Sequence, residues 1–240
     1  MRRSTCRFLL LTSDPVIPYS MTSGILFDFN GVIVDDEAQH CEALLATLAE
    51  HGCSVNREDY YREYLGLDDR ECFRFTFQRM GLPQDDRIVC EAVARKHALY
   101  QQMVTQSMQL VPGVADFIED AALDGFQLAI VSGALRSEID LILNQCGLRS
   151  HFAEIVAAED VAVCKPDPTG YNRARAMLEL SPQRCVVLED SIPGLRAARA
   201  AGIPCVMLAT SHPEAACAAA DLVWRDFVGH GPTELPWAHV

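Results

Sequence analysis

Short apolar runs alternate along the chain with longer stretches in which apolar positions recur at helical spacing. The apolar runs predict buried strands at 25–29, 128–132, 154–158, 185–188 and 205–208, with a weaker sixth at 222–224. The helical spacing predicts helices at 114–123, 136–146, 170–179 and 194–201. Gly147 and Gly202 stand where helix ends favour a left-handed residue. This alternation is typical of a parallel sheet with helices on both faces.

One long interval breaks the alternation. Between 37 and 109 the pattern is only helical, at 38–52, 57–64, 69–80 and 85–105, and this is too long for an ordinary strand-to-helix connection. We therefore predict an α/β protein with a Rossmann-like, doubly wound parallel sheet as its core and an inserted all-helical cap domain. The core takes residues 21–36 and 110–240, and the cap takes 37–109. Residues 1–20 are expected to be a disordered extension, because a second methionine, Met21, directly precedes the first strong strand.

Composition and charge narrow the class of partner. Half of the 240 residues are apolar, which allows a sizeable core, but no run approaches the eighteen apolar residues of a membrane span. The net charge of −13 argues against nucleic acid, whereas a metal or a few local cations can still draw a small anion into one site. The ten cysteines form no C-x-x-C pair, so we expect a reduced, cytoplasmic protein. No repeat or coiled-coil pattern suggests an assembly, and we expect a monomer.

Lysine is scarce in this sequence. Eighteen of the twenty basic residues are arginine, and the two lysines are Lys96 and Lys165. A chain that uses arginine for its general surface cations makes both lysines candidates for sites that need a compact positive charge. Chance retention of two lysines is the competing interpretation.

Polar segments stand at the carboxyl ends of several predicted strands, where open α/β sheets bind their ligands. They are Asp-Phe-Asn-Gly at 28–31, Ser-Gly at 132–133, Lys-Pro-Asp-Pro at 165–168 and Glu-Asp-Ser at 189–191. Each segment alone is also typical of an ordinary turn, loop or helix cap. Their joint occurrence at successive strand ends predicts a single site.

This order of segments resembles the haloacid dehalogenase superfamily, and within it the β-phosphoglucomutase-like branch, in which a helical cap follows the first segment. The likeness covers nearly all of 24–223. Its most specific parts are Leu-Glu-Asp-Ser-Ile-Pro-Gly-Leu at 188–195, which runs on to Ala-Ala-Gly at 200–202, and Cys-Lys-Pro-Asp-Pro at 164–168.

The resemblance implies a nucleophile and a metal site. Asp28 would attack phosphorus and become an aspartyl phosphate, which divides a difficult hydrolysis into two easier steps. Mg²⁺ would be bound by Asp28, by the backbone carbonyl of Asn30 and by Asp190, with Glu189 holding it directly or through water.

The resemblance also implies the groups that surround the transferring phosphoryl group. Ser132 and the backbone amide of Gly133 would donate hydrogen bonds to its oxygens. Lys165 would neutralise the charge shared by the phosphate and Asp28.

Asn30 departs from the family pattern, which has a second aspartate there to protonate the leaving oxygen and then activate water. An amide cannot exchange a proton in this way, and such help is typically worth about 10²–10⁴ in rate. Three consequences stay open: a slow phosphatase that prefers good leaving groups, a proton supplied instead by His40 or Lys96, or partial deamidation of the Asn30–Gly31 pair.

Other residues are candidates for contacts with the substrate. His40 follows Asp28 by twelve residues, the spacing at which the mutase branch has a histidine facing the nucleophile. Lys96, with Tyr100 one turn later, resembles a cap pair that contacts a distal phosphate in that branch, and Arg70 falls near the loop that reads substrate. Arg136 either reaches the phosphate or simply begins a helix. Each has an ordinary structural interpretation as a helix-surface or partly buried side chain.

These features together favour a Mg²⁺-dependent phosphatase of a small phosphorylated metabolite. A phosphomutase is the second reading, weakened by the missing acid at position 30. A dehalogenase needs no such acid but also no metal, and phosphonate cleavage would need Lys96 at a different place in the cap. The non-enzymatic alternative is a phospholigand-binding module whose catalysis has decayed.

Overall fold

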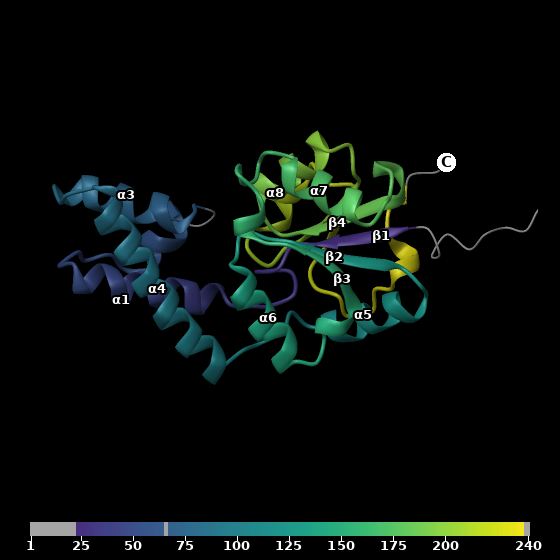
Figure 1. The fold of residues 1–240 in the computed structure, drawn as a ribbon, viewed down its shortest axis with the longest axis horizontal. Coiled ribbons are helices and arrows are strands. Elements are labelled where there is room, and N and C mark those ends of the chain that lie inside the picture. The colour runs from purple at the N-terminus through teal and green to yellow at the C-terminus, as the bar shows by residue number, and fades with distance from the viewer. Residues whose placement is uncertain (1–22, 65–66, 238–240) are drawn as a thin grey trace, which may run out of the picture.

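A single parallel sheet organises the sheet-containing part of the molecule (Figure 1). The computed structural model describes residues 23–64 and 67–237. The sheet has the order β3-β2-β1-β4-β5-β6, and each neighbouring pair is parallel. Its strands are β1 Gly24–Phe27, β2 Gln127–Val131, β3 Phe152–Val156, β4 Cys185–Glu189, β5 Cys205–Leu208 and β6 Leu222–Trp224. The predicted doubly wound α/β fold is therefore confirmed, with strand boundaries that shift by up to two residues.

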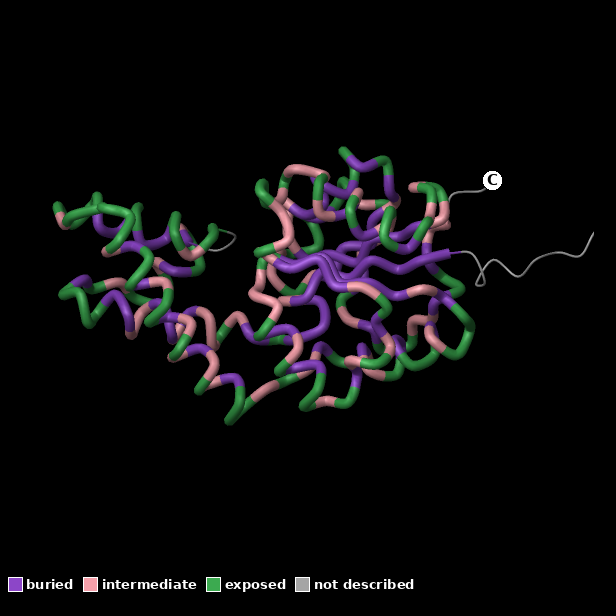
Figure 2. The backbone as a smooth tube through the Cα atoms, viewed as in Figure 1, coloured by how far each residue is buried: buried purple, intermediate pink, exposed green. Residues whose placement is uncertain are grey.

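The central strands are buried on both faces, which explains why they read as continuous apolar runs (Figure 2). Successive side chains of a strand point to opposite faces of the sheet. In β1, Ile25 and Phe27 join the larger apolar cluster on one face, whereas Leu26 joins the cluster on the other. A strand with two buried faces cannot show the polar alternation of a surface strand.

Four helices cover this sheet. They are α5 Val114–Leu123, α6 Arg136–Gln145, α7 Thr169–Met177 and α8 Ile192–Ala200. Helices α5 and α6 lie on one face, and α7 and α8 lie on the other (Figure 1). Gly147 and Gly202 have the positive φ expected after α6 and α8. Ser191 begins α8 by accepting a hydrogen bond from the Gly194 amide at 3.1 Å.

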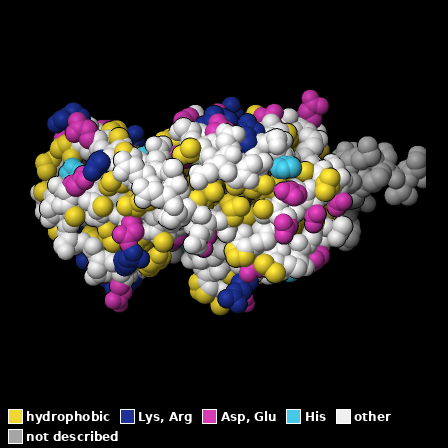
Figure 3. Space-filling view, turned by 90° about the horizontal axis from the view of Figure 1, so that it is seen from below, with side chains coloured by type: hydrophobic (Ala, Val, Ile, Leu, Met, Phe, Trp, Pro, Cys, Tyr) yellow, Lys and Arg dark blue, Asp and Glu magenta, His cyan; other side chains and the backbone are white. Residues whose placement is uncertain are grey.

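Further helices form the segment between β1 and α5. They are α1 Glu37–Glu50, α2 Arg57–Asp59, α3 Asp69–Met80 and α4 Asp86–Gln106. They lie beside the sheet, and a waist separates the two lobes in the space-filling view (Figures 1 and 3). Aromatic and aliphatic side chains give this helical lobe its own apolar cluster, which includes Leu44, Leu48, Phe73, Phe77 and Val89.

The predicted helix at 57–64 is confirmed in its bounds, but it is not α-helical throughout. The α-helical turn of α2 gives way to a π-helical turn at Tyr60–Tyr64. That turn stacks the rings of Tyr60 and Tyr64 almost parallel, 6.2 Å apart, and the Tyr60 hydroxyl donates to Glu37 Oε1 at 2.6 Å. These tertiary contacts favour a local widening of the helix that periodicity alone does not reveal.

Two antiparallel segments connect the lobes. The Asp35 amide donates to the Gln109 carbonyl at 2.9 Å, and the Val111 amide donates to the Ile33 carbonyl at 3.0 Å. Asp35, in the segment that follows β1, is thus tied to the segment that leaves α4.

Three further expectations concern the N-terminal extension, membrane spans and the cysteines. The extension predicted at 1–20 lies outside the described residues. Among the described helices, none combines the length and the apolar character that crossing a bilayer requires. Each of the nine cysteines in the described part of the chain is a free thiol.

Candidate active site at the carboxyl edge of the sheet

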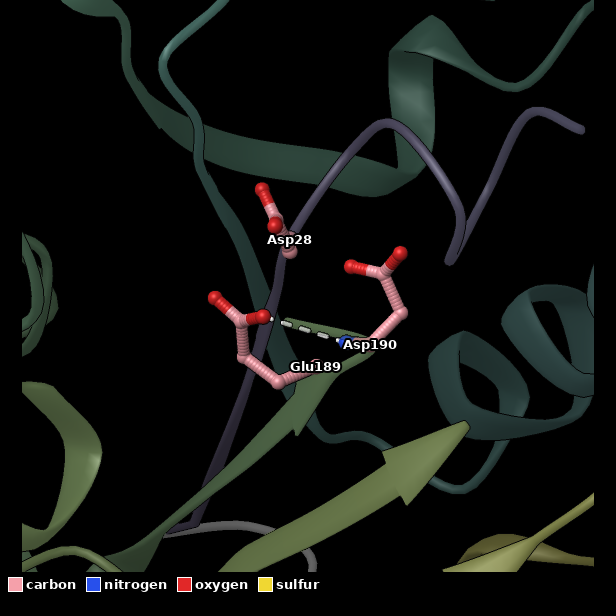
Figure 4. A group of neighbouring side chains, drawn as sticks. All are labelled: Asp28, Glu189 and Asp190. Atoms are coloured by element: carbon pink, nitrogen blue, oxygen red, sulfur yellow. Dashed lines mark hydrogen bonds between the residues drawn. The ribbon is translucent and has the colours of Figure 1, made fainter. Parts of the chain in front are cut away.

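Strand register brings two acidic segments together. The parallel pairing of β1 with β4 sets Phe27 beside Leu188, and the Asp28 amide donates to the Leu188 carbonyl at 2.8 Å. The next residue of each strand, Asp28 and Glu189, therefore projects from the same edge of the sheet. Figure 4 shows both side chains pointing toward a common space that Asp190 also enters.

The three carboxylates form a compact group. Asp28, Glu189 and Asp190 each offer an oxygen, and these oxygens lie within 4.8 Å of one another. All three residues are buried. Like charges this close are unfavourable unless a cation or a proton is present among them.

Lys165 supplies one cation to this group. Its ammonium lies 2.9 Å from Asp28 Oδ1 and 2.6 Å from Glu189 Oε1, and 5.3 Å from the centre of the Tyr171 ring. One ammonium among three carboxylates still leaves an excess of negative charge. The donors are all oxygen atoms, which is the set that Mg²⁺ prefers, so the residues present fit a hard divalent cation.

Glu189 is held by hydrogen bonds from every side. Its Oε1 accepts from the Tyr171 hydroxyl at 2.7 Å and from Lys165. Its Oε2 accepts from the amides of Asp190 and Ser191, each at 3.0 Å, and from the Ser191 hydroxyl at 2.9 Å. Five donors occupy the two oxygens of a side chain that is 0% exposed.

Asp28 and Asp190 are less completely occupied. Asp28 Oδ1 accepts from Lys165 and from the Phe29 amide, and Asp190 Oδ2 accepts a short hydrogen bond from the Ser211 hydroxyl. Within the described residues, the second oxygen of each carboxylate has no hydrogen-bond partner. These two oxygens are the ones free to bind an ion or a substrate.

Glycine at two positions makes this packing possible. A Cβ on Gly31 would lie 2.0 Å from Asp190 Oδ2, and Gly31 also has a φ of +71°. A Cβ on Gly194 would lie 1.7 Å from Glu189 Oε1. Both glycines are therefore required for the backbone to approach the acidic group this closely.

The site changes the proton affinity of its members. Burial, reinforced by the charge of Glu189, raises the pKa of Asp28 to about 7. Burial and the charges of Asp28 and Glu189 raise the pKa of Asp190 well above its usual range. Burial opposes the charged forms of Glu189 and Lys165 as well, but their mutual attraction lowers the pKa of Glu189 and, together with Asp28, raises that of Lys165. A divalent cation here would favour the ionised form of both aspartates.

Ser132 and Gly133 lie at the same edge, directly after β2, the other neighbour of β1. Ser132 is buried, its amide donates to the Val156 carbonyl at 3.0 Å, and its hydroxyl oxygen accepts from the Ala134 amide at 3.0 Å. Gly133 is exposed, and a Cβ there would meet nothing within 4 Å. The two residues flank the acidic group without a direct hydrogen bond to it in the described structure.

The Asn30 side chain turns toward the helical lobe. Its Nδ2 donates to Asp36 Oδ2 at 2.7 Å and lies 3.1 Å from His40 Nε2. The Tyr100 hydroxyl donates a short hydrogen bond to the same oxygen of Asp36, a residue that is only 1% exposed. Sequence reasoning missed Asp36, because its position directly before α1 suggests a cap, whereas its side chain makes no capping hydrogen bond.

Two candidates from the helical lobe, His40 and Lys96, lie together. Lys96 Nζ lies 2.6 Å from His40 Nδ1 and 2.9 Å from Asp69 Oδ1, and His97 Nε2 lies 2.9 Å from Asp69 Oδ2. His40 and Lys96 thus meet near Asn30, as the candidates for a proton donor must. Arg70, in contrast, is exposed. No signal in the sequence pointed to Asp69 or His97.

Arg136 begins α6 and binds groups at the end of β3, as its structural interpretation expects. Its guanidinium donates to the Ile155 carbonyl at 2.8 Å and pairs with Asp160. These bonds tie the start of α6 to the end of β3.

Comparison with known proteins finds relatives of this chain. The sequence profile of haloacid dehalogenase-like hydrolases matches residues 25–208. The chain is 28% identical to validoxylamine A 7′-phosphate phosphatase of Streptomyces hygroscopicus subsp. limoneus, over 90% of this chain and 96% of the relative. It is 34% identical to protein CbbY of Cereibacter sphaeroides, over 78% of this chain and 84% of the relative. A mutant of CbbY from Rhodobacter sphaeroides, solved with xylulose-(1,5)bisphosphate, superposes with a TM-score of 0.81 and 28% identity, over 90% of this chain and 99% of that one.

Proposed function

The chain belongs to the haloacid dehalogenase-like hydrolase family, and from that premise we propose that it is a Mg²⁺-dependent phosphatase of a small phosphorylated metabolite. One observation carries the proposal: Lys165 bridges Asp28 and Glu189 inside a group of three buried carboxylates. This arrangement presents a nucleophilic carboxylate beside a fixed ammonium, which suits attack on a phosphate. The relatives, validoxylamine A 7′-phosphate phosphatase and a CbbY protein solved with xylulose-(1,5)bisphosphate, support a small phosphorylated metabolite as the substrate class.

Asp28 is the nucleophile in this proposal. Its carboxylate forms a bond to phosphorus while the ester oxygen leaves with the bonding pair and takes up a proton. Water then attacks phosphorus, which releases phosphate and restores the carboxylate. Lys165 binds Oδ1 of Asp28 and thereby holds the Asp28 side chain with its other oxygen toward the substrate. Ser132 and the Gly133 amide, at the end of the neighbouring strand, donate to the transferring oxygens.

Mg²⁺ would be held by Asp28, Asp190 and the backbone carbonyl of Asn30. When bound, it supplies charge neutralisation between the nucleophile and the phosphoryl oxygens. We place Glu189 outside direct coordination, because five protein donors already occupy its oxygens. Glu189 then serves to fix Lys165 and the backbone of Asp190.

Asn30 limits the rate in this scheme. Its amide cannot protonate the leaving oxygen. Outside the acidic trio, two titratable groups contact this amide: Asp36 at 2.7 Å, whose lowered pKa keeps it a carboxylate, and His40 at 3.1 Å. We propose that the enzyme favours substrates whose leaving group needs little protonation, with His40 as the remaining proton source. Deamidation of Asn30 is disfavoured, since the Gly31 nitrogen donates to the Val34 carbonyl at 2.8 Å and the Asn30 amide is bound to Asp36. Peptide mass analysis should find no deamidated form.

The helical lobe acts as the cap in this proposal. Residues 37–109 form it, and residues 21–36 and 110–240 form the core. The side chains of Asn30 and Tyr100 meet at Asp36, so cap position and catalytic loop are physically coupled. Closing the cap over the site would exclude water from the transferring phosphoryl group.

A phospholigand-binding module without turnover is the second candidate, and Asn30 is the observation that favours it. A phosphomutase is disfavoured by the same residue, because that reaction moves a proton to and from a sugar hydroxyl. The experiment that separates them is hydrolysis of acetyl phosphate and p-nitrophenyl phosphate with Mg²⁺ and with a chelator. We expect slow, Mg²⁺-dependent phosphate release that Asp28→Ala abolishes. Tight phosphate binding with no release would favour the module.

A further inference from the structure

The Lys96 ammonium is already occupied by protein groups. It is 2% exposed, and its nitrogen lies within hydrogen-bond distance of His40 Nδ1 at 2.6 Å and of both oxygens of Asp69, at 2.9 and 3.0 Å. Asp69 is in turn held by His97 at 2.9 Å. An anionic ligand could reach this ammonium only by displacing Asp69 and leaving a partly buried carboxylate without its counter-ion.

Asp69 is a carboxylate at neutral pH. Burial alone would raise its pKa, but hydrogen bonds from His97 and Lys96 and the charge of Lys96 lower it. The Lys96–Asp69 pair is therefore neutral as a unit. Because His40 links this pair to Asn30, the neutral pair lies on the side of the helical lobe that faces the catalytic loop.

Other cations of the helical lobe are paired in the same way. Between 37 and 106 the chain has eight basic residues, and seven of them pair with a carboxylate: Arg57, Arg62, Arg74, Arg79, Arg87, Arg95 and Lys96. Arg70 is the one without a carboxylate partner within the described part of the chain. The lobe thus offers a single uncommitted cation to a ligand.

The surroundings of Arg70 repel anions. It belongs to the first turn of α3, together with Asp69 and Glu71, and Asp68 precedes it as the N-cap. The Asp68 carboxylate accepts from the Glu71 amide at 2.8 Å, so acidic side chains already satisfy the end of the helix that would attract a phosphate. Asp69 is already paired with Lys96, and the two other carboxylates of this turn, Asp68 and Glu71, still outweigh the one guanidinium of Arg70.

We propose that the substrate carries a single phosphoryl group and presents an uncharged, hydroxyl-bearing remainder, with no second phosphate, to helices α1, α3 and α4. This inference rests on the proposed function and narrows it. The phosphoryl group meets Lys165 and the metal site, whereas the rest of the molecule meets hydrogen-bonding groups that include the Asn30 amide and the His40 ring. A sugar bisphosphate would bring its second dianion against the neutral Lys96–Asp69 pair and the acidic turn of α3.

The test compares matched pairs of phosphate esters: fructose 6-phosphate with fructose 1,6-bisphosphate, and ribulose 5-phosphate with ribulose 1,5-bisphosphate. With saturating Mg²⁺, we expect kcat/KM for each monophosphate to exceed that of its bisphosphate by about tenfold or more, because an uncompensated anion is rejected. Calorimetric binding to Asp28→Asn, which cannot turn over, should show the same order of affinity. A bisphosphate preferred in either measurement overturns the inference.

Two variants test the cause. Asp69→Asn frees Lys96 and should raise the bisphosphate-to-monophosphate ratio by about tenfold. Asp68→Asn removes the same charge one residue earlier but leaves the Lys96–Asp69 pair intact, so it should only weaken the repulsion by the acidic turn and raise the ratio by about threefold or less. Equal shifts in both variants would contradict the role assigned to the Lys96–Asp69 pair.

The double variant Lys96→Gln/Asp69→Asn keeps the test decisive where Asp69→Asn alone fails to fold, as thermal melting would reveal, because it replaces the neutral ion pair by uncharged amides. A lysine that does not bind a second phosphate can be replaced in this way without lowering the bisphosphate-to-monophosphate ratio, so a selective loss of bisphosphate turnover overturns the inference. Acetyl phosphate distinguishes an error in the substrate class from an error in the proposed phosphatase activity. Its Mg²⁺-dependent hydrolysis with a bisphosphate preference would refute only the substrate class, whereas no phosphate release from any compound would refute the phosphatase.

Discussion

The carboxamide of Asn30 donates to the buried carboxylate of Asp36 at 2.7 Å. The same Asp36 oxygen accepts from Tyr100 on α4. The charge of His40 and the hydrogen bonds to Asp36 lower the pKa of that carboxyl, although burial alone would raise it. The side chain two residues after the proposed nucleophile is thus fixed by a permanent anion between the lobes. This contact sets the electrostatic surroundings, and therefore the pKa, of an acid introduced at position 30.

Replacing Asn30 with aspartate should increase hydrolysis of esters with poor leaving groups. In Asn30→Asp, two carboxyl groups would share the space now bridged by one hydrogen bond, so one of them holds a proton near neutral pH. A general acid placed in this way is typically worth about 10²–10⁴ in rate. We expect a gain of that order in kcat for alkyl phosphates and a much smaller gain for acetyl phosphate. Equal gains on both substrates would show that the new carboxyl does not act as the acid.

The metal site should respond differently to its two neighbouring acids. Asp190→Asn removes a carboxylate with an uncommitted oxygen, and we expect Mg²⁺ binding by calorimetry to fall below detection. Glu189→Gln changes a residue that contacts only protein donors, and a change beyond the ligands typically costs about 10–100-fold in affinity. Glu189→Gln should also lower the melting temperature in the absence of metal, because it removes the buried partner of Lys165. Loss of Mg²⁺ binding confined to Glu189→Gln would reverse our assignment.

Much of this site could be predicted from the sequence, because several of its residues directly follow predicted strands. Asp28 and Asp190 each follow a run of buried apolar residues, and parallel strands bring such positions to one edge of the sheet. Lys165 belongs to a short polar loop whose residue types carry the family resemblance. Helix and strand positions follow from periodicity for the same reason: the pattern and the structure are set within one element.

The parts that escaped prediction depend on contacts between distant elements. Asp69 reaches Lys96 across 27 residues, and Tyr171 reaches Glu189 across 18. These partners are fixed by how the helices pack, which single-element periodicity does not encode. Lys96 illustrates the difference: its scarcity in the sequence drew attention to it, but its pairing with Asp69 argues against the distal-phosphate role that the resemblance implied.

Stability should depend on pH through the buried aspartates. The pKa of Asp28 is raised to about 7 in the folded protein, so the folded state binds a proton more tightly than the unfolded chain does. Its contribution is therefore most favourable below the ordinary pKa of aspartate and is lost as pH rises toward 7. We expect the melting temperature in chelator to fall between pH 5 and pH 8, and Mg²⁺ to stabilise more at pH 8. Asp28→Asn should flatten the first trend, and an unchanged slope in that variant would exclude Asp28 as its source.

Gly31 should be the least replaceable glycine of the site. In Gly31→Ala the new Cβ would lie 2.0 Å from Asp190 Oδ2 and the residue would keep a φ of +71°, so the variant suffers both a clash and backbone strain. Gly52→Ala is the matched control, because Gly52 has a φ of +76° and nothing within 4 Å of its Cβ position. Both variants should lose about 1–2 kcal/mol of stability from the left-handed backbone. Only Gly31→Ala should also displace Asp190, weaken Mg²⁺ binding and lower phosphatase activity about 10²-fold, since small misplacements at a reacting centre cost that much. Equal activity in the two variants, at matched fractions folded, would mean that Asp190 tolerates displacement and does not define the metal site.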